Sequence, residues 1–78
     1  MEVVMDILTE ALEGAGKTKI MYGANLNFVR FNYYLSEMLE NGLLVEESRV
    51  EGRVLYRATD NGRALLEALR EAQQLMSI

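Results

Sequence analysis

Glycine spacing, in a chain that lacks proline altogether, sets the strongest limit on how these 78 residues can fold. The first segment, Glu2–Glu13, repeats its apolar residues at the spacing of an amphipathic helix and is followed at once by Gly14 and Gly16. Glycine just after the last periodic residue is a typical helix terminator, because it adopts backbone conformations that other residues avoid. We therefore predict a helix over residues 2–13.

The next two segments predict a pair of helices joined by a tight turn. A short helix fits Thr18–Tyr22, and Gly23–Asn25 follows it as the turn. Asn27 then has the properties of an N-cap for a helix over about 28–41, which Gly42 ends. The residues on either side of this cap have the spacing of a hydrophobic staple: Leu26 and Phe31. Two helices joined by a short glycine-containing turn form a helix-turn-helix.

A β-hairpin is predicted after these helices. Leu43–Glu47 is predicted as one strand and Arg53–Ala58 as the return strand, with a turn within residues 49–52. Alternation along the return strand puts Val54, Tyr56 and Ala58 on one face. The hairpin as a whole is expected over residues 43–58.

One more helix completes the chain. It is expected over residues 61–76, with Thr59 or Asp60 as its cap. The order helix, helix, helix, hairpin, helix predicts the α+β, mostly α, winged helix-turn-helix fold, in which the hairpin is the wing. The length allows one hydrophobic core, so residues 1–78 are expected to form one domain.

Composition excludes several classes of function. The chain contains neither cysteine nor histidine, which excludes disulfides and thiolate metal sites and removes the commonest metal ligand and general base. No apolar run approaches the roughly 18–20 residues that span a bilayer, and Glu2 and Asp6 stand where a signal peptide would carry bases. We therefore expect a cytoplasmic protein that is not an enzyme and binds no cofactor.

The net charge of −4 is unevenly distributed along the chain. Residues 14–36 carry bases but no acid, whereas residues 1–13 and 37–47 carry acids but no base. Three bases against one acid make residues 48–58 a second basic block. The bases of the two blocks are Lys17, Lys19, Arg30, Arg49, Arg53 and Arg57. Because DNA affinity depends on where positive charge lies, a fold that sets these blocks side by side would favour phosphate binding.

Three stretches resemble conserved segments of a known family. Lys17–Leu26 is similar to its second helix, and Leu55–Arg63 to the junction between wing and last helix. Tyr34–Leu35 followed by Met38–Leu44 is similar to the end of its recognition helix and the first wing strand. The family is that of the ten-kilodalton archaeal winged-helix DNA-binding proteins and their regulator relatives. The resemblance implies DNA binding by a homodimer joined through the C-terminal helix. Chromatin proteins of this family are basic and have a longer C-terminal helix, so a compact dimer is expected here.

Two other patterns have simpler explanations. Gly14–Thr18 partly matches a phosphate-binding loop, but position 11 is alanine and a helix precedes it where that motif requires a strand. We therefore reject nucleotide binding. Four acids of the first segment have helical spacing that could suggest a metal or catalytic site: Glu2, Asp6, Glu10 and Glu13. A solvated helix face explains them fully.

The start of the third helix carries the candidate base-reading residues. Arg30 can pair with guanine through two hydrogen bonds, Val29 can contact a thymine methyl, and Tyr33 can reach a phosphate. Asn27 is also a candidate at this end of the helix, although it is expected to act as the helix cap rather than as a base reader. The candidate backbone contacts belong to the second helix and the wing tip: Lys17, Lys19, Arg49 and Arg53. These residues predict a transcriptional regulator that binds double-stranded DNA.

The last helix carries two apolar stripes, one more than packing on its own domain requires. The stripes predict a homodimer contact through Leu65, Leu66, Leu69, Ala72, Leu75 and Met76. The alternative for the whole chain is a winged-helix module for protein contact, within transcription machinery or an acidic dimeric assembly. An acidic chain with exposed Val29 and Tyr33 would suit that role.

Overall fold

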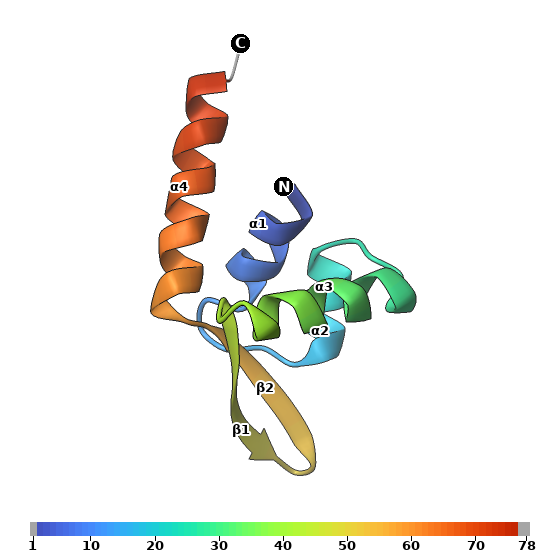
Figure 1. The fold of residues 1–78 in the computed structure, drawn as a ribbon. Helices are drawn as coiled ribbons and strands as arrows, with labels where there is room; N and C mark the ends of the chain where they lie inside the picture. The colour runs from blue at the N-terminus through green and yellow to red at the C-terminus, as the bar shows by residue number, and fades with distance from the viewer. Residues whose placement is uncertain (1, 77–78) are drawn as a thin grey trace.

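The computed structural model describes residues 2–76, apart from the side chains of residues 48–50. Four helices and one antiparallel hairpin follow one another as the sequence predicts, which confirms the winged helix-turn-helix fold (Figure 1). The elements are α1 (Glu2–Glu10), α2 (Lys17–Gly23), α3 (Phe28–Glu40), β1 (Leu44–Val50), β2 (Arg53–Ala58) and α4 (Asp60–Met76).

The helix boundaries differ from the predictions by up to three residues. Helix α1 ends at Glu10, and residues 11–13 form turns. Helix α2 includes Gly23 and ends through Asn25, which has a φ of 55°. The Leu26 N–H then donates to the Met21 carbonyl at 3.1 Å, which closes the helix end. Asparagine tolerates this left-handed conformation better than most residues, so the turn begins later than Gly23 suggests.

Both ends of α3 are fixed by the residues that the sequence indicates. The Asn27 side chain accepts a hydrogen bond from the Arg30 N–H at 2.8 Å, and this satisfies one free donor of the first turn. Gly42 has a φ of 72°, and the Leu43 N–H donates to the Met38 carbonyl at 2.9 Å. This is the hydrogen-bond pattern of a glycine-terminated helix.

The wing is an antiparallel hairpin with a two-residue turn and one bulge. Its turn residues, Glu51 and Gly52, have φ angles of 51° and 78°, the left-handed pair that a two-residue hairpin turn requires. The register shifts between Glu46 and Ser48, so Glu47 forms a bulge.

One further backbone pairing, which the sequence does not reveal, lies beside the two strands of the wing. Ala15 and Tyr56 exchange backbone hydrogen bonds of 2.9 and 2.8 Å. The loop between α1 and α2 is thereby tied to the middle of β2. Gly14 and Gly16 therefore flank a paired residue rather than serving only as helix terminators.

The hydrophobic core lies among the first three helices, the base of the wing and the first turns of α4. Every one of its buried members is apolar or aromatic: Ile7, Leu8, Ala11, Ala15, Ile20, Ala24, Leu26, Phe31, Leu35, Met38, Leu44, Tyr56, Ala58 and Leu66. None of the described helices is long and apolar enough to cross a membrane.

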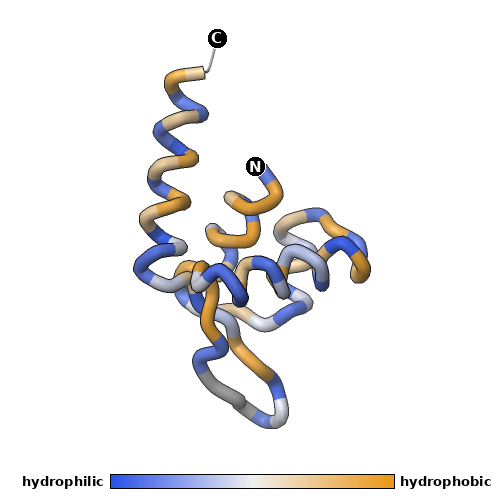
Figure 2. The backbone as a smooth tube through the Cα atoms, viewed as in Figure 1, coloured by the Kyte–Doolittle hydropathy of each residue, from blue (hydrophilic) through white to orange (hydrophobic). Residues whose placement is uncertain are grey.

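Helix α4 packs on α1 near its start and then extends beyond the rest of the domain (Figure 1). Thr59 is its cap, because the Thr59 hydroxyl accepts from the Gly62 N–H at 3.0 Å. The prediction that Leu66 faces a partner is wrong, because its side chain is only 2% exposed within its own core. Apolar residues continue to the far end of α4 (Figure 2), where Leu75 and Met76 are 81% and 79% exposed.

Candidate nucleic-acid interface

The outward face of α3 is apolar and aromatic in its first half. Val29 and Tyr33 are 78% and 63% exposed, one helical turn apart on the same face. Arg30 is exposed beside them. The second half of the helix differs, because Glu37 and Glu40 are its exposed charged residues. Only the first half can therefore approach a polyanion without repulsion.

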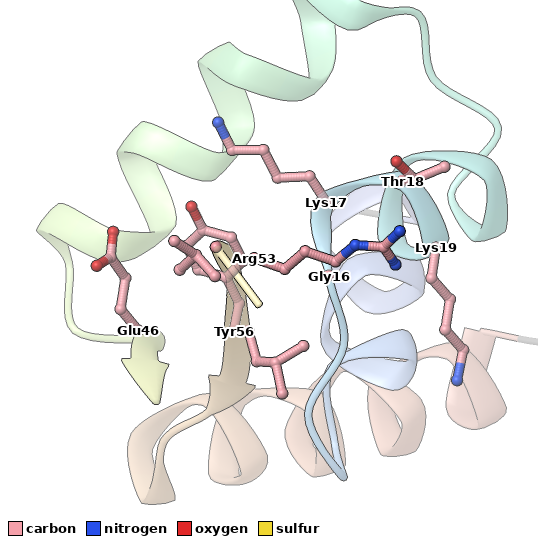
Figure 3. Close-up of a pocket in the computed structure, with 10 residues that line it drawn as sticks. Gly16, Lys17, Thr18, Lys19, Glu46, Arg53 and Tyr56 are labelled. Carbon is pink, nitrogen blue, oxygen red and sulfur yellow. The ribbon is translucent and has the colours of Figure 1, made fainter. Parts of the chain in front are cut away.

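Three bases from two distant parts of the chain line one groove. The groove has a volume of about 910 Å³ and lies between the start of α2 and the wing (Figure 3). Lys17 and Lys19 line it from α2, and Arg53 lines it from β2. Glu46 is the acid among its lining residues. The fold thus brings together bases of both blocks, which are more than thirty residues apart in the sequence.

Arg57 and Arg63 lie outside this groove and are engaged elsewhere. Arg57 pairs with the Glu47 carboxylate and with Glu13 at 3.5 Å, and it donates to the Leu12 carbonyl at 3.3 Å. Arg63 donates to the same carbonyl at 2.7 Å. These contacts join the turns after α1, the wing and α4. Arg57 therefore belongs to a structural cluster, although it lies in the second basic block of the sequence.

The Arg57 cluster also affects ionisation. Hydrogen bonds from the Arg57 guanidinium hold the pKa of the Glu47 carboxyl below its usual value. A carboxyl whose pKa is lower in the folded state stabilises the fold above its unfolded pKa. That contribution is lost as the pH falls through the folded pKa.

The structure leaves the bases of the predicted site available. Among the residues whose side chains are described, Lys17, Lys19, Arg30 and Arg53 form no ion pair. Arg30 lies on α3, outside the groove that the other three line. The backbone of Arg49 pairs with Val54 in the wing, and its side chain lies outside the described part of the chain.

Asn27 has a definite structural role. Its side-chain oxygen accepts the capping hydrogen bond from the Arg30 N–H, which fixes the position of the side chain at the start of α3. The residue as a whole is exposed.

Two exposed aromatic residues were not among the predicted site residues. Phe28, the first residue of α3, is 62% exposed, and Tyr22 in the last turn of α2 is exposed as well. Helical periodicity does not reveal them, since Phe28 lies at the first position of α3, where the rest of the domain does not cover the helix. The cap at Asn27 was the available signal, because it places the next residue at the exposed tip of the helix.

The comparison with known families agrees with this arrangement. A family model described as winged helix-turn-helix matches residues 1–77. This chain belongs to that winged helix-turn-helix family. An uncharacterized protein of Methanocaldococcus jannaschii is 31% identical over 77 residues, which are 97% of this chain and 74% of that protein.

Solved structures share the winged helix-turn-helix domain. Sso10a-2, a DNA-binding protein from Sulfolobus solfataricus, is 29% identical with a TM-score of 0.85, and the match covers 96% of this chain and 78% of that one. A MarR family transcriptional regulator from Silicibacter pomeroyi is 22% identical with a TM-score of 0.76 over 96% of this chain and 55% of that one. The second likeness supports the fold alone.

Proposed function

We propose that this chain is a homodimeric transcriptional regulator of the cytoplasm that binds double-stranded DNA. In this proposal the first half of α3 enters the major groove and the wing contacts the phosphate backbone. Membership in a winged helix-turn-helix family points to a regulator rather than an enzyme, and the proposal assigns no catalytic residue. The similarity to a DNA-binding protein of Sulfolobus solfataricus supports it.

The observation that carries the proposal is the distribution of free bases. Lys17, Lys19 and Arg53 line one groove between α2 and the wing, while other arginines of the chain are held by the Arg57 cluster. A chain of net charge −4 therefore still offers a local cationic surface. Local charge, rather than net charge, governs phosphate binding.

A salt titration tests DNA binding directly. Fluorescence anisotropy on a random-sequence duplex is expected to show binding that weakens steeply with salt. Four to five phosphate contacts per subunit would give a log–log slope of roughly −4 per subunit. Binding that is undetectable at low salt, or independent of salt, would contradict the proposal.

The dimer is proposed to form through the part of α4 that extends beyond the domain. Its candidate contacts, without the buried Leu66, are Leu65, Leu69, Ala72, Leu75 and Met76. Leu65 is partly covered by the domain core, so the later residues would carry most of the contact. A two-fold dimer would place two copies of α3 in successive major grooves, with half-sites about one helical turn apart.

Charge placed in the α4 contact is expected to abolish the dimer. Leu69→Glu would bury a carboxylate at the interface, which is strongly unfavourable, so sedimentation should report the 8.9 kDa chain instead of twice that mass. Gln74→Glu is the matched control, because position 74 lies on the opposite side of α4 from Leu69. A monomeric wild-type chain at tens of micromolar, or equal effects of both variants, would remove α4 as the interface.

A protein-contact function is the second candidate. Exposed apolar residues on α3, together with Glu37 and Glu40 on the same helix, are the observations that favour it. The salt titration separates the two, since a module for protein contact has no reason to bind duplex DNA in a salt-dependent way.

A further inference from the structure

Three exposed residues form an apolar reading surface on the first half of α3: Phe28, Val29 and Tyr33. Val29 and Tyr33 lie on adjacent turns of one face, and Phe28 is next to Val29 at the helix tip. Side chains this apolar are costly to leave in water unless they contact something. Their exposure at the part of α3 that faces outward calls for a ligand with apolar groups.

The charges around the apolar reading surface identify the ligand as anionic. Residues 14–36 contain no acid, and Arg30 lies within the surface itself. The groove bases Lys17 and Lys19 belong to the same acid-free stretch. An apolar surface that contains a base and belongs to an acid-free stretch of the chain complements a polyanion that displays apolar groups, and the major groove of DNA displays the thymine methyls among its phosphates.

Few groups on this surface can read bases by hydrogen bonding. Adenine is usually read by an Asn or Gln amide and guanine by Arg or Lys. The Asn27 oxygen is already bonded to the Arg30 N–H at 2.8 Å, which holds this amide in its capping position at the start of α3. Arg30 and the half-buried Asn32 are thus the remaining hydrogen-bonding readers among residues 27–33, whereas three side chains suit methyl groups.

We propose that the apolar reading surface recognises the 5-methyl groups of pyrimidines in the major groove, so that the chain prefers thymine-rich duplexes. The inference rests on the proposed function and adds the chemical feature that α3 reads. The acids Glu37 and Glu40 keep the second half of α3 away from phosphates, which directs the helix tip, with Phe28 and Val29, into the groove.

Removing the methyl groups alone tests this inference. The wild-type chain is titrated by anisotropy against a mixed A·T duplex and against the same duplex with deoxyuridine in place of thymidine. Uracil keeps every hydrogen-bonding group and lacks only the methyl, so affinity is expected to fall about three- to tenfold. A G·C duplex with 5-methylcytosine should gain affinity by a similar factor over its unmethylated form.

Substitutions test whether the apolar reading surface causes the preference for thymine over uracil. Phe28→Ala and Val29→Ala should bring the thymine-to-uracil ratio close to one. Arg30→Ala, the control, should weaken binding to both duplexes and leave the ratio unchanged. All three side chains are exposed, so these substitutions should change the free energy of unfolding little.

The outcomes separate the two proposals. Salt-dependent binding with equal affinity for thymine and uracil duplexes would overturn methyl recognition and leave DNA binding intact. Tighter binding to single-stranded oligothymidine than to any duplex would also overturn it, since the aromatic side chains would then be stacking on bases. Failure to bind any duplex would overturn the proposed function, and the inference with it.

Discussion

Gly62→Ala is expected to destabilise the fold by about 2–3 kcal/mol, although alanine is the better helix former. Gly62 is buried in the first turn of α4. A methyl group there would lie 2.2 Å from the Leu43 carbonyl oxygen and 3.1 Å from the Leu8 side chain. The oxygen belongs to the backbone and already accepts from the Thr59 N–H at 3.0 Å. It cannot move without breaking the junction between the wing and α4.

Chemical denaturation followed by circular dichroism measures this effect as a lower midpoint. Gly16→Ala is the matched control, because its new methyl would meet nothing closer than the Val54 carbonyl oxygen at 3.9 Å. Gly16 is the N-cap residue of α2, so the cost of this change should stay below about 1 kcal/mol. Equal stability of Gly62→Ala and wild type would show that α4 can move away from the Leu43 carbonyl.

Local signals predict most of the fold. Asn27 and Thr59 satisfy the free N–H groups of the helices that they precede, and Gly42 adopts the left-handed conformation that ends α3. Each depends on residues within five positions, so the sequence displays them directly. The helix order and the wing follow from these boundaries.

Contacts between distant segments are what the sequence conceals. The pairing of Ala15 with Tyr56 joins residues 41 positions apart, and no periodicity indicates it. Leu66 shows the same limit: its helix has two apolar stripes, and only packing decides which one is buried. The stripe next to α1 entered the core.

The candidate site also combines features that the sequence shows with features that depend on contacts between distant segments. Exposure of Val29 and Tyr33 follows from helical spacing within one element. The availability of each base depends on ion pairs across elements. Arg53 and Arg57 are four residues apart and look alike in the sequence, yet Arg57 is bound to Glu47 and Glu13, whereas Arg53 lines the groove. The bulge at Glu47 contributes to this difference, since it changes the register of β1 opposite these residues.

The double variant Lys17→Gln/Arg53→Gln is expected to lower duplex affinity on the order of 50-fold at about 0.1 M salt. Both side chains line the groove between α2 and the wing. Each lost phosphate contact should also reduce the log–log salt slope by roughly 0.9, so the slope should become shallower by about 2 per subunit. Anisotropy titrations of wild type and variant across a salt series measure both quantities.

A second double variant controls for net charge. Arg70→Gln/Gln74→Glu makes the chain more negative by the same two units, but on α4, where Arg70 donates to the Thr9 hydroxyl at 3.2 Å. Helix α4 extends away from the wing (Figure 1), and mobile ions screen charges beyond about 10 Å at this salt concentration. This variant should therefore bind almost as wild type does. If both variants lose affinity equally, net charge alone governs binding and the groove holds no phosphate. If only the groove variant loses affinity, the position of the bases explains how an acidic chain can bind DNA.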